Sequence, residues 1–350
     1  MQKKLQQKIL ITGAAGFIGF HLCEKLLANN FEVVGLDNIN DYYDSELKYA
    51  RLKELGIKKE EAETFGNKTK SEIHGDNFRF VRLNLEDKEN LPKLFAEENF
   101  NMVCNLAAQA GVRYSLENPM AYVESNLVGF VNLLECMRHA DVKKLVYASS
   151  SSVYGLNEKT PFSVNDVVDH PISLYAATKK SNELMAYTYS HLYDLQCIGL
   201  RFFTVYGPWG RPDMAMFLFT DAIINNKPIK VFNHGKLSRD FTYIDDIIEG
   251  VFATLTIPKD EKYALYNIGN GQPVPLMNFI EAVEKSLGKE ATKEMYPMQP
   301  GDVEQTWADT TSLEENYAYK PTTKINEGVG RFVKWYEEYY NLKNTPTAKS

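Results

Sequence analysis

Short apolar runs alternate with longer stretches of helical periodicity through the first part of the chain. The runs are rich in β-branched and aromatic residues, which is typical of strands buried on both faces. The stretches between them are long enough for crossover helices, so the alternation predicts a parallel sheet covered by helices on both sides. Six strands are expected, at residues 8–12, 31–36, 78–83, 102–106, 144–148 and 196–202.

This pattern changes near residue 206, where glycine and proline begin to punctuate shorter, mixed elements. We therefore predict an α/β protein with a Rossmann-like, doubly wound parallel sheet in residues 1–205 and a smaller C-terminal α/β substrate lobe in residues 206–350. Residues 241–257 carry a strand and helix signal and are expected to return to the first domain.

Two further segments have distinct patterns. Residues 57–77 are rich in lysine, glutamate and glycine without apolar periodicity, and are expected to form a surface excursion that carries no chemistry. Residues 325–340 form an aromatic-rich amphipathic pattern, which predicts a helix packed on the core.

Composition narrows the possible ligands. The 350 residues are 44% hydrophobic and 24% charged, as in ordinary globular proteins. The formal net charge of −7 gives no general attraction to nucleic acid, so an anionic ligand needs a local basic pocket. The six histidines and four cysteines show no metal-ligand spacing, and no metal is expected.

The expected location is the cytoplasm. Cys23, Cys104, Cys136 and Cys197 lie far apart in apolar runs, as buried free thiols do in a reducing compartment. The first eight residues are polar and basic, without an apolar signal region, and no apolar run reaches the roughly 18 residues of a membrane span.

A glycine-rich loop joins the first strand to the next helix. In KILITGAAGFIGFHL, Gly13, Gly16 and Gly19 are spaced for a tight turn that lets a diphosphate approach free N–H groups at a helix N-terminus. Phe17 and Ile18 belong to the same loop. Asp37 ends the second strand, where it can accept hydrogen bonds from ribose hydroxyls, and Asn38 after it brings no arginine for a 2′-phosphate. The pattern predicts binding of NAD in preference to NADP.

Tyr175 and Lys179 are candidates for the proton-transfer chemistry. They stand four apart in a helical pattern, so both side chains should project from one face. The spacing alone is weak evidence, because 21 tyrosines in this chain give two more such pairs, Tyr49/Lys53 and Tyr339/Lys343. Only Tyr175/Lys179 follows the fifth strand, where its helix should face the nicotinamide. A nearby ammonium and a positive nicotinamide both favour the phenolate of a tyrosine, whose ordinary pKa is about 10.

The chain resembles the extended short-chain dehydrogenase/reductase superfamily and, within it, the nucleotide-sugar 4-epimerases. The resemblance covers nearly the whole length, through ITGAAGFIG, NLAAQAGVRYS, ASSSSVYG, SLYAATKKSNE, LRFFTVYGPWGRPDM, SRDFTYIDDI and MQPGDV. The second, fifth and last of these look like the uronate-specific members, the UDP-glucuronate 4-epimerases. The resemblance implies reversible C4 epimerisation of UDP-glucuronate to UDP-galacturonate, by transient oxidation with bound NAD.

The resemblance also implies roles for individual residues. Ser150 would be the hydroxyl partner of Tyr175, and Arg239 and Asp302 would hold the UDP portion. The sugar carboxylate would be surrounded by Ser151, Ser152, Thr204 and Arg211. The cofactor would be lined further by Asn84, Leu85, Leu106, Ala107, Ala108 and Asn126. Asn84 stands where relatives commonly have an acid near the adenine, and the 57–77 excursion is longer than in relatives.

Structural roles remain open for the two arginines. Arg211 is two residues from Asp213 and can simply pair with it within the loop. Arg239 likewise has Asp240 and Asp245 nearby in sequence. A planar guanidinium nevertheless suits a carboxylate or a diphosphate, which it can contact with two parallel hydrogen bonds.

Several alternative functions remain. One is a 4-epimerase of a neutral UDP-hexose or UDP-N-acetylhexosamine, although such enzymes usually have asparagine at the position of Thr204. Decarboxylases and dehydratases of the same fold carry acidic residues where this chain has Ser151 and Ser152. A non-catalytic NAD-binding protein would leave the Tyr175/Lys179 pair unexplained. The apolar helices at 121–139 and 173–193, together with the resemblance, predict a homodimer built on a four-helix contact.

Overall fold

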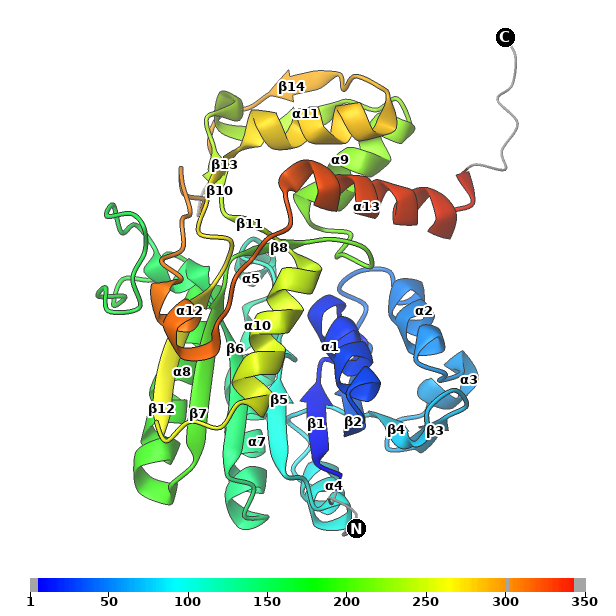
Figure 1. Ribbon diagram of the computed structural model, residues 1–350, viewed down its shortest axis with the longest axis vertical. Coiled ribbons are helices and arrows are strands. Elements are labelled where there is room, and N and C mark those ends of the chain that lie inside the picture. Colours follow the sequence, from blue (N-terminus) through cyan, green and yellow to red (C-terminus); the bar gives the residue numbers. More distant parts are fainter. Residues whose placement is uncertain (1–5, 300–301, 343–350) are drawn as a thin grey trace.

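An eight-stranded, mostly parallel sheet forms the centre of the protein, as the computed structural model in Figure 1 shows. The structure describes residues 6–299 and 302–342. Across the sheet the strands run in the order β12-β7-β6-β5-β1-β2-β4-β3, and only β3 runs antiparallel to its neighbour. Their bounds are β1 Lys8–Thr12, β2 Glu32–Asp37, β3 Lys68–Ser71, β4 Gly75–Arg82, β5 Met102–Asn105, β6 Lys144–Ser150, β7 Gln196–Phe202 and β12 Tyr263–Ile268.

Successive residues of the central strands point to opposite faces, and both faces are covered. In β1, Ile9 and Ile11 belong to one hydrophobic cluster and Leu10 belongs to the other, and all three are fully buried. This is why the strands read as continuous apolar runs and not as alternating ones. The predicted doubly wound α/β fold is confirmed, and each of the six predicted strands corresponds to a strand of this sheet.

Helices pack on both faces of the sheet. The helices α1 and α10 cross the near face in Figure 1, where they contact each other. The opposite face is covered by α4, α7 and α8, whose apolar residues join the second cluster. The helices that accompany the sheet are α1 Phe17–Ala28, α2 Glu46–Glu54, α3 Lys59–Ala62, α4 Asn90–Glu98, α5 Tyr114–Glu117, α6 Pro119–Tyr122, the π-helical turn η1 Val123–Val128, α7 Gly129–His139, the 3₁₀ turn η2 Ser151–Tyr154, α8 Leu174–Tyr193, α10 Ile244–Thr256 and α12 Thr311–Tyr317.

A smaller group of elements lies beyond the carboxyl ends of the strands, at the top of Figure 1. It contains α9, α11 and α13 with three two-stranded pairings, β8 with β11, β9 with β14 and β10 with β13. The predicted amphipathic helix at 325–340 corresponds to α13, whose Val329, Phe332 and Val333 are buried. The bounds are β8 Thr204–Tyr206, α9 Ala215–Ile224, β9 Ile229–Val231, the 3₁₀ turn η3 Phe232–Gly235, β10 Ser238–Arg239, β11 Phe241–Tyr243, β13 Val274–Pro275, α11 Leu276–Leu287, β14 Lys293–Met295 and α13 Ile325–Tyr339.

Two strands of the sheet lie outside the segments in which strands were expected. β12 comes from the C-terminal part of the chain and pairs in parallel with β7 along its whole length. β3 lies inside the 57–77 excursion and pairs with β4. The domain boundaries at 205 and 206, with 241–257 returning, remain a prediction, and they leave β12 outside the first domain.

Other sequence expectations can be checked against the described residues. All four cysteines are buried and free. None of the helices in 6–299 and 302–342 is both long enough and apolar enough to cross a membrane. The same ranges contain no group of three or more His, Cys, Asp or Glu side chains placed to hold a metal ion.

Candidate active site

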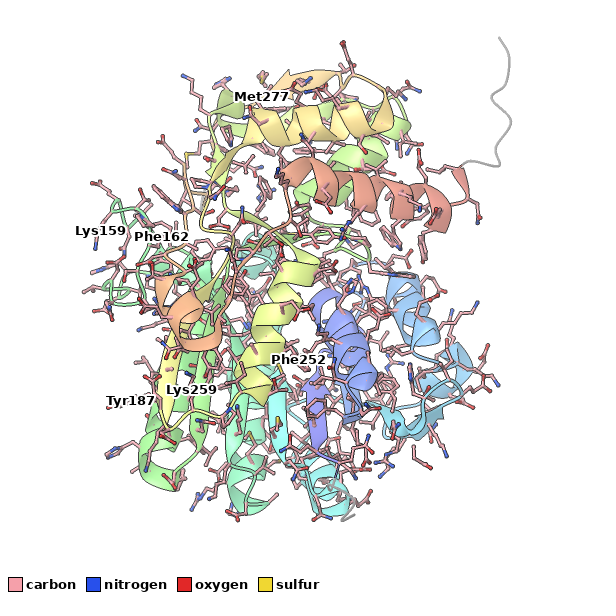
Figure 2. All side chains as sticks on the ribbon, in the orientation of Figure 1. Lys159, Phe162, Tyr187, Phe252, Lys259 and Met277 are labelled. Atoms are coloured by element: carbon pink, nitrogen blue, oxygen red, sulfur yellow. The ribbon has the colours of Figure 1, made fainter. Side chains whose placement is uncertain are left out.

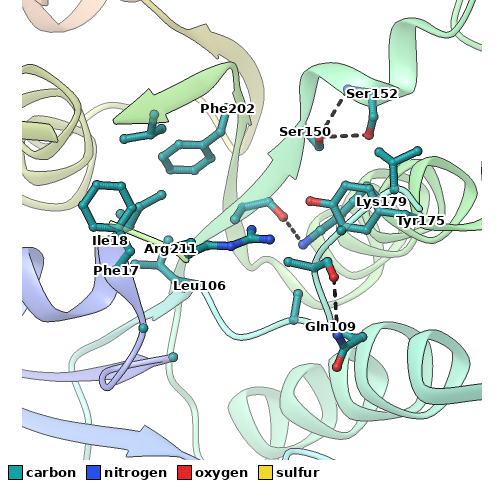
Figure 3. Close-up of a pocket in the computed structure, with 18 of the residues that line it drawn as sticks. Phe17, Ile18, Leu106, Gln109, Ser150, Ser152, Tyr175, Lys179, Phe202 and Arg211 are labelled. Atoms are coloured by element: carbon teal, nitrogen blue, oxygen red, sulfur yellow. Dashed lines mark hydrogen bonds between the residues drawn. The ribbon is translucent and has the colours of Figure 1, made fainter. Parts of the chain in front are cut away.

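A cavity of about 460 Å³ opens at the carboxyl ends of the parallel strands, between the sheet and the smaller group of elements. Its walls come from the loops after β1, β2, β5, β6 and β7 and from the segment that follows β8. Figure 3 shows Tyr175, Lys179, Ser150, Ser152 and Arg211 gathered around this space. Ligands of doubly wound sheets bind at this edge, so the cavity is the candidate site.

The glycine loop after β1 forms one wall of the cavity. Gly13 has φ of 74°, and a Cβ there would lie 2.9 Å from the Ala107 nitrogen, so the position needs glycine. A Cβ on Gly19 would lie 2.0 Å from the Gly13 oxygen. Because glycine has no Cβ, α1 can pack closely against the loop. Helix α1 begins after Gly16 without a side-chain cap, so its first N–H groups stay available to a diphosphate.

Asp37 ends β2 at the edge of the same cavity. Its carboxylate accepts the backbone N–H of Ala15 at 3.1 Å and that of Ile39 at 2.8 Å. Asp37 therefore ties the glycine loop to the turn after β2, while it still lines the cavity. These features fit a dinucleotide: a loop that only glycines can form, a helix N-terminus without a cap, and a carboxylate at the ribose end.

Tyr175 and Lys179 lie in the first two turns of α8 and face the cavity. The helix begins after Ser173, whose hydroxyl accepts the N–H of Ala176 at 3.1 Å. Lys179 is 3% exposed and donates from Nζ to the Ala148 oxygen at 2.9 Å, with Nζ 5.9 Å from the centre of the Tyr175 ring. Burial lowers the pKa of Lys179 from its ordinary 10.5 to about 8.

The phenol of Tyr175 needs positive charge before it can act as a base. Burial raises its pKa, and the nearby Ser150 hydroxyl and Arg211 guanidinium only partly oppose this. Ser150 ends β6 and accepts a hydrogen bond from the Ser152 hydroxyl of η2 at 2.9 Å, so a chain of hydroxyls lies beside the phenol. The arrangement can remove a proton from a sugar hydroxyl when a cationic ring binds nearby.

Arg211 lies across the cavity from these hydroxyls, and it already has a carboxylate partner. Its Nε donates to one oxygen of Asp213 at 3.0 Å and its Nη2 donates to the other at 2.5 Å. The Tyr42 hydroxyl donates to the same carboxylate at 3.0 Å. Burial would raise the pKa of Asp213, but Arg211 outweighs this effect and lowers it. Arg211 thus pairs with Asp213, which the sequence left open, and its guanidinium also lines the cavity.

Arg239 also lines the cavity. Its acidic partner is neither Asp240 nor Asp245, the two acids near it in sequence. Its Nη2 donates to Asp302 at 2.5 Å, and its Nη1 donates to the backbone oxygens of Ser238 and Glu304. Asp240 instead accepts three backbone N–H groups, those of Asn270, Gly271 and Ala308. The two residues that the resemblance assigns to UDP therefore contact each other.

Nearly all the site residues expected from the sequence line this one cavity. These are Gly13, Gly16, Phe17, Ile18, Gly19, Asp37, Asn38, Leu85, Leu106, Ala107, Ala108, Ser150, Ser151, Ser152, Tyr175, Lys179, Thr204, Arg211, Arg239 and Asp302. Two expected cofactor residues do not line it. Asn84 lies outside the wall, and Asn126 is buried behind it, where it bonds Gln109 and Thr178. Their roles remain predictions.

Other residues line the cavity although the sequence did not single them out. They come from four loops and from α2, and they are Tyr42, Tyr43, Lys48, Glu86, Gln109 and Asp213, of which only Asp213 was considered before, as a partner of Arg211. Glu86 lines the cavity beside Leu85, two positions after Asn84. The acidic and aromatic character of the DYYD segment was a visible signal, but nothing in its spacing indicated a role.

Comparisons with known proteins agree with this geometry. The model of the NAD dependent epimerase/dehydratase family matches residues 9–269. The chain is 52% identical to Protein CapI of Staphylococcus aureus, over 95% of this chain and 99% of that protein. It is 45% identical to a probable UDP-glucuronate 4-epimerase of Rhizobium meliloti, over 97% and 99%. The crystal structure of UDP-glucuronic acid 4-epimerase from Bacillus cereus, in complex with UDP-glucuronic acid and NAD, superposes with a TM-score of 0.85 at 34% identity, over 95% of this chain and 100% of that one.

The buried ammonium of Lys179 leads to a test of stability. Because its pKa is lower folded than unfolded, both states are protonated below pH 8 and folding then carries the full cost of burying the charge. From 10.5 to about 8, at about 1.4 kcal/mol per pKa unit, this cost is roughly 3 kcal/mol. Lys179→Met also loses the bond to Ala148, so we expect a net stabilisation of roughly 1–2 kcal/mol at pH 7 in urea unfolding of the cofactor-free protein.

The stabilisation by Lys179→Met should shrink as pH rises from about 8 to 10.5. Over this range the folded natural protein holds Lys179 without its proton, and the cost of burying the charge disappears. Lys180→Met, one position along α8, removes a partly exposed ammonium and serves as the control. A stability difference between Lys179→Met and the natural protein that stays constant from pH 7 to pH 10 would contradict this explanation.

Proposed function

The chain belongs to the NAD dependent epimerase/dehydratase family, and on that basis we propose that it interconverts UDP-glucuronate and UDP-galacturonate with NAD as a bound cofactor. One observation carries the choice of an acidic sugar: a guanidinium, Arg211, shares a single cavity with the Tyr175/Lys179 pair and the serine hydroxyls. Named relatives and a solved structure with UDP-glucuronic acid and NAD support the same substrate.

NAD fits the residues that line the cavity. We propose that Gly13, Gly16, Phe17, Ile18 and Gly19 hold its diphosphate, with Asp37 and Asn38 at the adenosine ribose and Lys179 at the other end. Leu85, Leu106, Ala107 and Ala108 form the walls beside it, while Asn84 and Asn126 are assigned only by family resemblance. Bound NAD supplies the chemistry that the chain lacks, a hydride acceptor that can also return the hydride.

Tyr175 is proposed to take the proton from the C4 hydroxyl of the sugar. The charge of Lys179 favours the phenolate, and Ser150 can hydrogen-bond both the phenol and the substrate oxygen. When the 4-keto sugar is reduced, the same phenol returns the proton. Since nothing is consumed overall, one set of residues serves both directions of the reaction.

The other end of the sugar is proposed to be held by Arg211 with Ser151, Ser152 and Thr204. The sugar carboxylate must compete with Asp213 for the guanidinium, and the three hydroxyls can donate to the remaining carboxylate lone pairs. We propose that Arg239 contacts the diphosphate of UDP and that Asp302, its partner in the structure, completes this end.

The residues that follow β6 do not favour the lyase alternatives. Ser151 and Ser152 occupy the places where dehydratases and decarboxylases of this fold carry acids, so no acidic proton shuttle stands beside the Ser150 hydroxyl. We further propose that the protein works in the cytoplasm, a location in which the four buried free cysteines remain reduced.

The function is tested by incubating the purified protein with UDP-glucuronate, without added cofactor, and identifying the product by NMR. We expect UDP-galacturonate, and we expect Tyr175→Phe to lower kcat at least about 100-fold, since the variant lacks the one oxygen that transfers the proton. The variant should fold and retain NAD like the natural protein.

Turnover of UDP-galactose in preference to UDP-glucuronate would show that the substrate assignment is wrong. Substantial activity of Tyr175→Phe would remove Tyr175 from the role of base. Tyr340→Phe, at an exposed position outside the cavity and outside α8, is the control for the loss of a tyrosine hydroxyl.

Arg211→Lys tests whether Arg211 fixes the orientation of the sugar carboxylate. Oxidation at C4 makes a β-keto acid, which loses carbon dioxide readily when the C5–C6 bond lies perpendicular to the ketone plane. Two parallel hydrogen bonds from a guanidinium can hold the carboxylate away from that alignment, and an ammonium cannot fix it as well. We expect slower epimerisation, by roughly 10- to 100-fold, and a larger share of turnovers that end in a UDP-pentose and carbon dioxide.

The product ratio is measured with UDP-glucuronate labelled with ¹³C at C6. If Arg211→Lys epimerises at the natural rate and retains every carbon, the pairing with Asp213 is the whole role of Arg211.

We also propose a homodimer formed through α7 and α8. Leu184, Tyr187 and Leu192 on α8 are each more than half exposed, and Val128 at the end of η1 and Val131 in α7 are exposed as well. Tyr187 lies at the outer edge of the molecule in Figure 2. An apolar helical surface of this kind is typical of a two-fold contact in which the same helices of two subunits meet.

Sedimentation equilibrium should therefore give twice the chain mass of 39.9 kDa. Leu184→Asp should raise the dimer dissociation constant by at least about 100-fold, because each subunit would bury a carboxylate at the contact. Leu218→Asp, on the exposed face of α9, should leave the dimer unchanged. A natural protein that sediments as a monomer at all concentrations would contradict the proposal.

A further inference from the structure

Arg51 in α2 is fully buried and contacts two loops of the site at once. Its Nη1 donates to the Ala15 oxygen in the glycine loop at 2.9 Å, and to the Tyr43 hydroxyl at 2.9 Å. Its Nε and Nη2 donate to the Trp209 oxygen at 3.2 and 2.7 Å, and Nη2 also reaches the Gly210 oxygen at 3.2 Å. All three guanidinium nitrogens are used, mostly by backbone carbonyls.

The environment of Arg51 is unusual for a buried cation. Within residues 6–299 and 302–342 it forms no ion pair with any carboxylate, although its exposed fraction is 0%. Burying an unpaired charge is costly and usually persists only where several hydrogen bonds hold it in one geometry. Arg51 is not part of the cavity wall either, so it does not touch a ligand there.

The second loop is strained where Arg51 holds it. Trp209 has φ of 61°, in the left-handed region that a bulky side chain avoids. Its ring packs against Phe20 of α1 at 5.6 Å and against Trp335 and Tyr339 of α13 at 5.2 Å each. This packing fixes the side chain, and the bonds from Arg51 fix the carbonyl, so the backbone is held from both sides.

The strained residue stands two positions before Arg211. A change in the Trp209 or Gly210 backbone therefore moves the Arg211 side chain relative to the glycine loop, which Arg51 contacts through Ala15. Tyr43, the fourth partner of Arg51, lies next to Tyr42, which bonds Asp213, the present partner of Arg211. Both connections from Arg51 lead to the same guanidinium.

We infer that Arg51 is a positioning residue that sets the distance between the glycine loop and Arg211, and through it the alignment of the sugar carboxylate. The inference rests on the proposed function, because it gives Arg211 the carboxylate of the sugar. A lysine can replace the charge of Arg51 but cannot reach four acceptors in fixed directions, so the loop after β8 would relax in Arg51→Lys.

A double-mutant cycle between Arg51→Lys and Arg211→Lys tests the inference. For each protein, kcat and KM for UDP-glucuronate and the fraction of UDP-pentose are measured, with NAD content and the thermal unfolding midpoint as further readouts. We expect Arg51→Lys alone to lower kcat/KM about 10- to 100-fold and to raise the UDP-pentose fraction. In the Arg211→Lys background, Arg51→Lys should lower kcat/KM by less than about threefold.

Leu313→Ala, in the core of α12, is the matched control for lost stability, since Leu313 is fully buried and contacts neither loop. It should lower the unfolding midpoint while leaving the UDP-pentose fraction unchanged. Tyr43→Phe removes one acceptor of Arg51 without changing its charge, and it should move the UDP-pentose fraction in the same direction by a smaller amount. This variant keeps the test open if Arg51→Lys does not fold.

Effects of Arg51→Lys and Arg211→Lys that simply multiply would overturn the inference, as would an Arg51→Lys protein that loses stability but keeps the natural product ratio. Failure of the proposed function is a separate result, because the natural protein would then make no UDP-galacturonate. A natural protein that epimerises UDP-glucuronate, together with a multiplicative cycle, rejects only the role of Arg51.

Discussion

The placement of α8 on the sheet depends on one buried ion pair. Glu183 of α8 and Arg201 of β7 are each 1% exposed and form two hydrogen bonds, at 2.8 and 2.9 Å, and the Ser149 hydroxyl of β6 donates to the same carboxylate at 2.7 Å. Breaking such a pair leaves an uncompensated buried charge, so the register of α8 against both strands is fixed. Lys179 lies one turn and Tyr175 two turns before Glu183 on this helix, so the ion pair determines where both side chains meet the cavity.

The rest of the site is built from loops that the parallel sheet brings to one edge. One wall is the glycine loop, where Gly13 and Gly19 let the backbone come close to a dinucleotide. The other wall is the loop after β8, which contains Arg211 and the strained residue Trp209. The buried side chain of Arg51 hydrogen-bonds to both of these walls. The chemistry proposed at C4 needs a hydride acceptor on one wall and a held carboxylate on the other, so the spacing of the two walls matters as much as either wall itself.

The sequence was sufficient for the parts that depend on local pattern. Apolar runs separated by helical stretches predict β1 to β7 apart from β3, because burial on both faces leaves a continuous apolar signal. The Tyr175/Lys179 pair followed from its place after a strand and not from its spacing. The sequence could not predict β12, which reaches the sheet only through a long-range pairing. Nor could it predict the partners of Arg51, because its backbone acceptors lie 36 to 159 positions away. It left open whether Arg211 pairs with Asp213, since that depends on side-chain directions.

In the proposed reaction, the hydrogen removed from C4 returns to the same sugar inside one cavity that also holds the carboxylate. The most direct measurement uses UDP-glucuronate carrying deuterium at C4 and ¹³C at C6, incubated with the purified protein and with unlabelled NADH in the solution. We expect UDP-galacturonate that retains both labels. Loss of the deuterium to the pool in solution, or loss of the ¹³C as carbon dioxide in most turnovers, would contradict it.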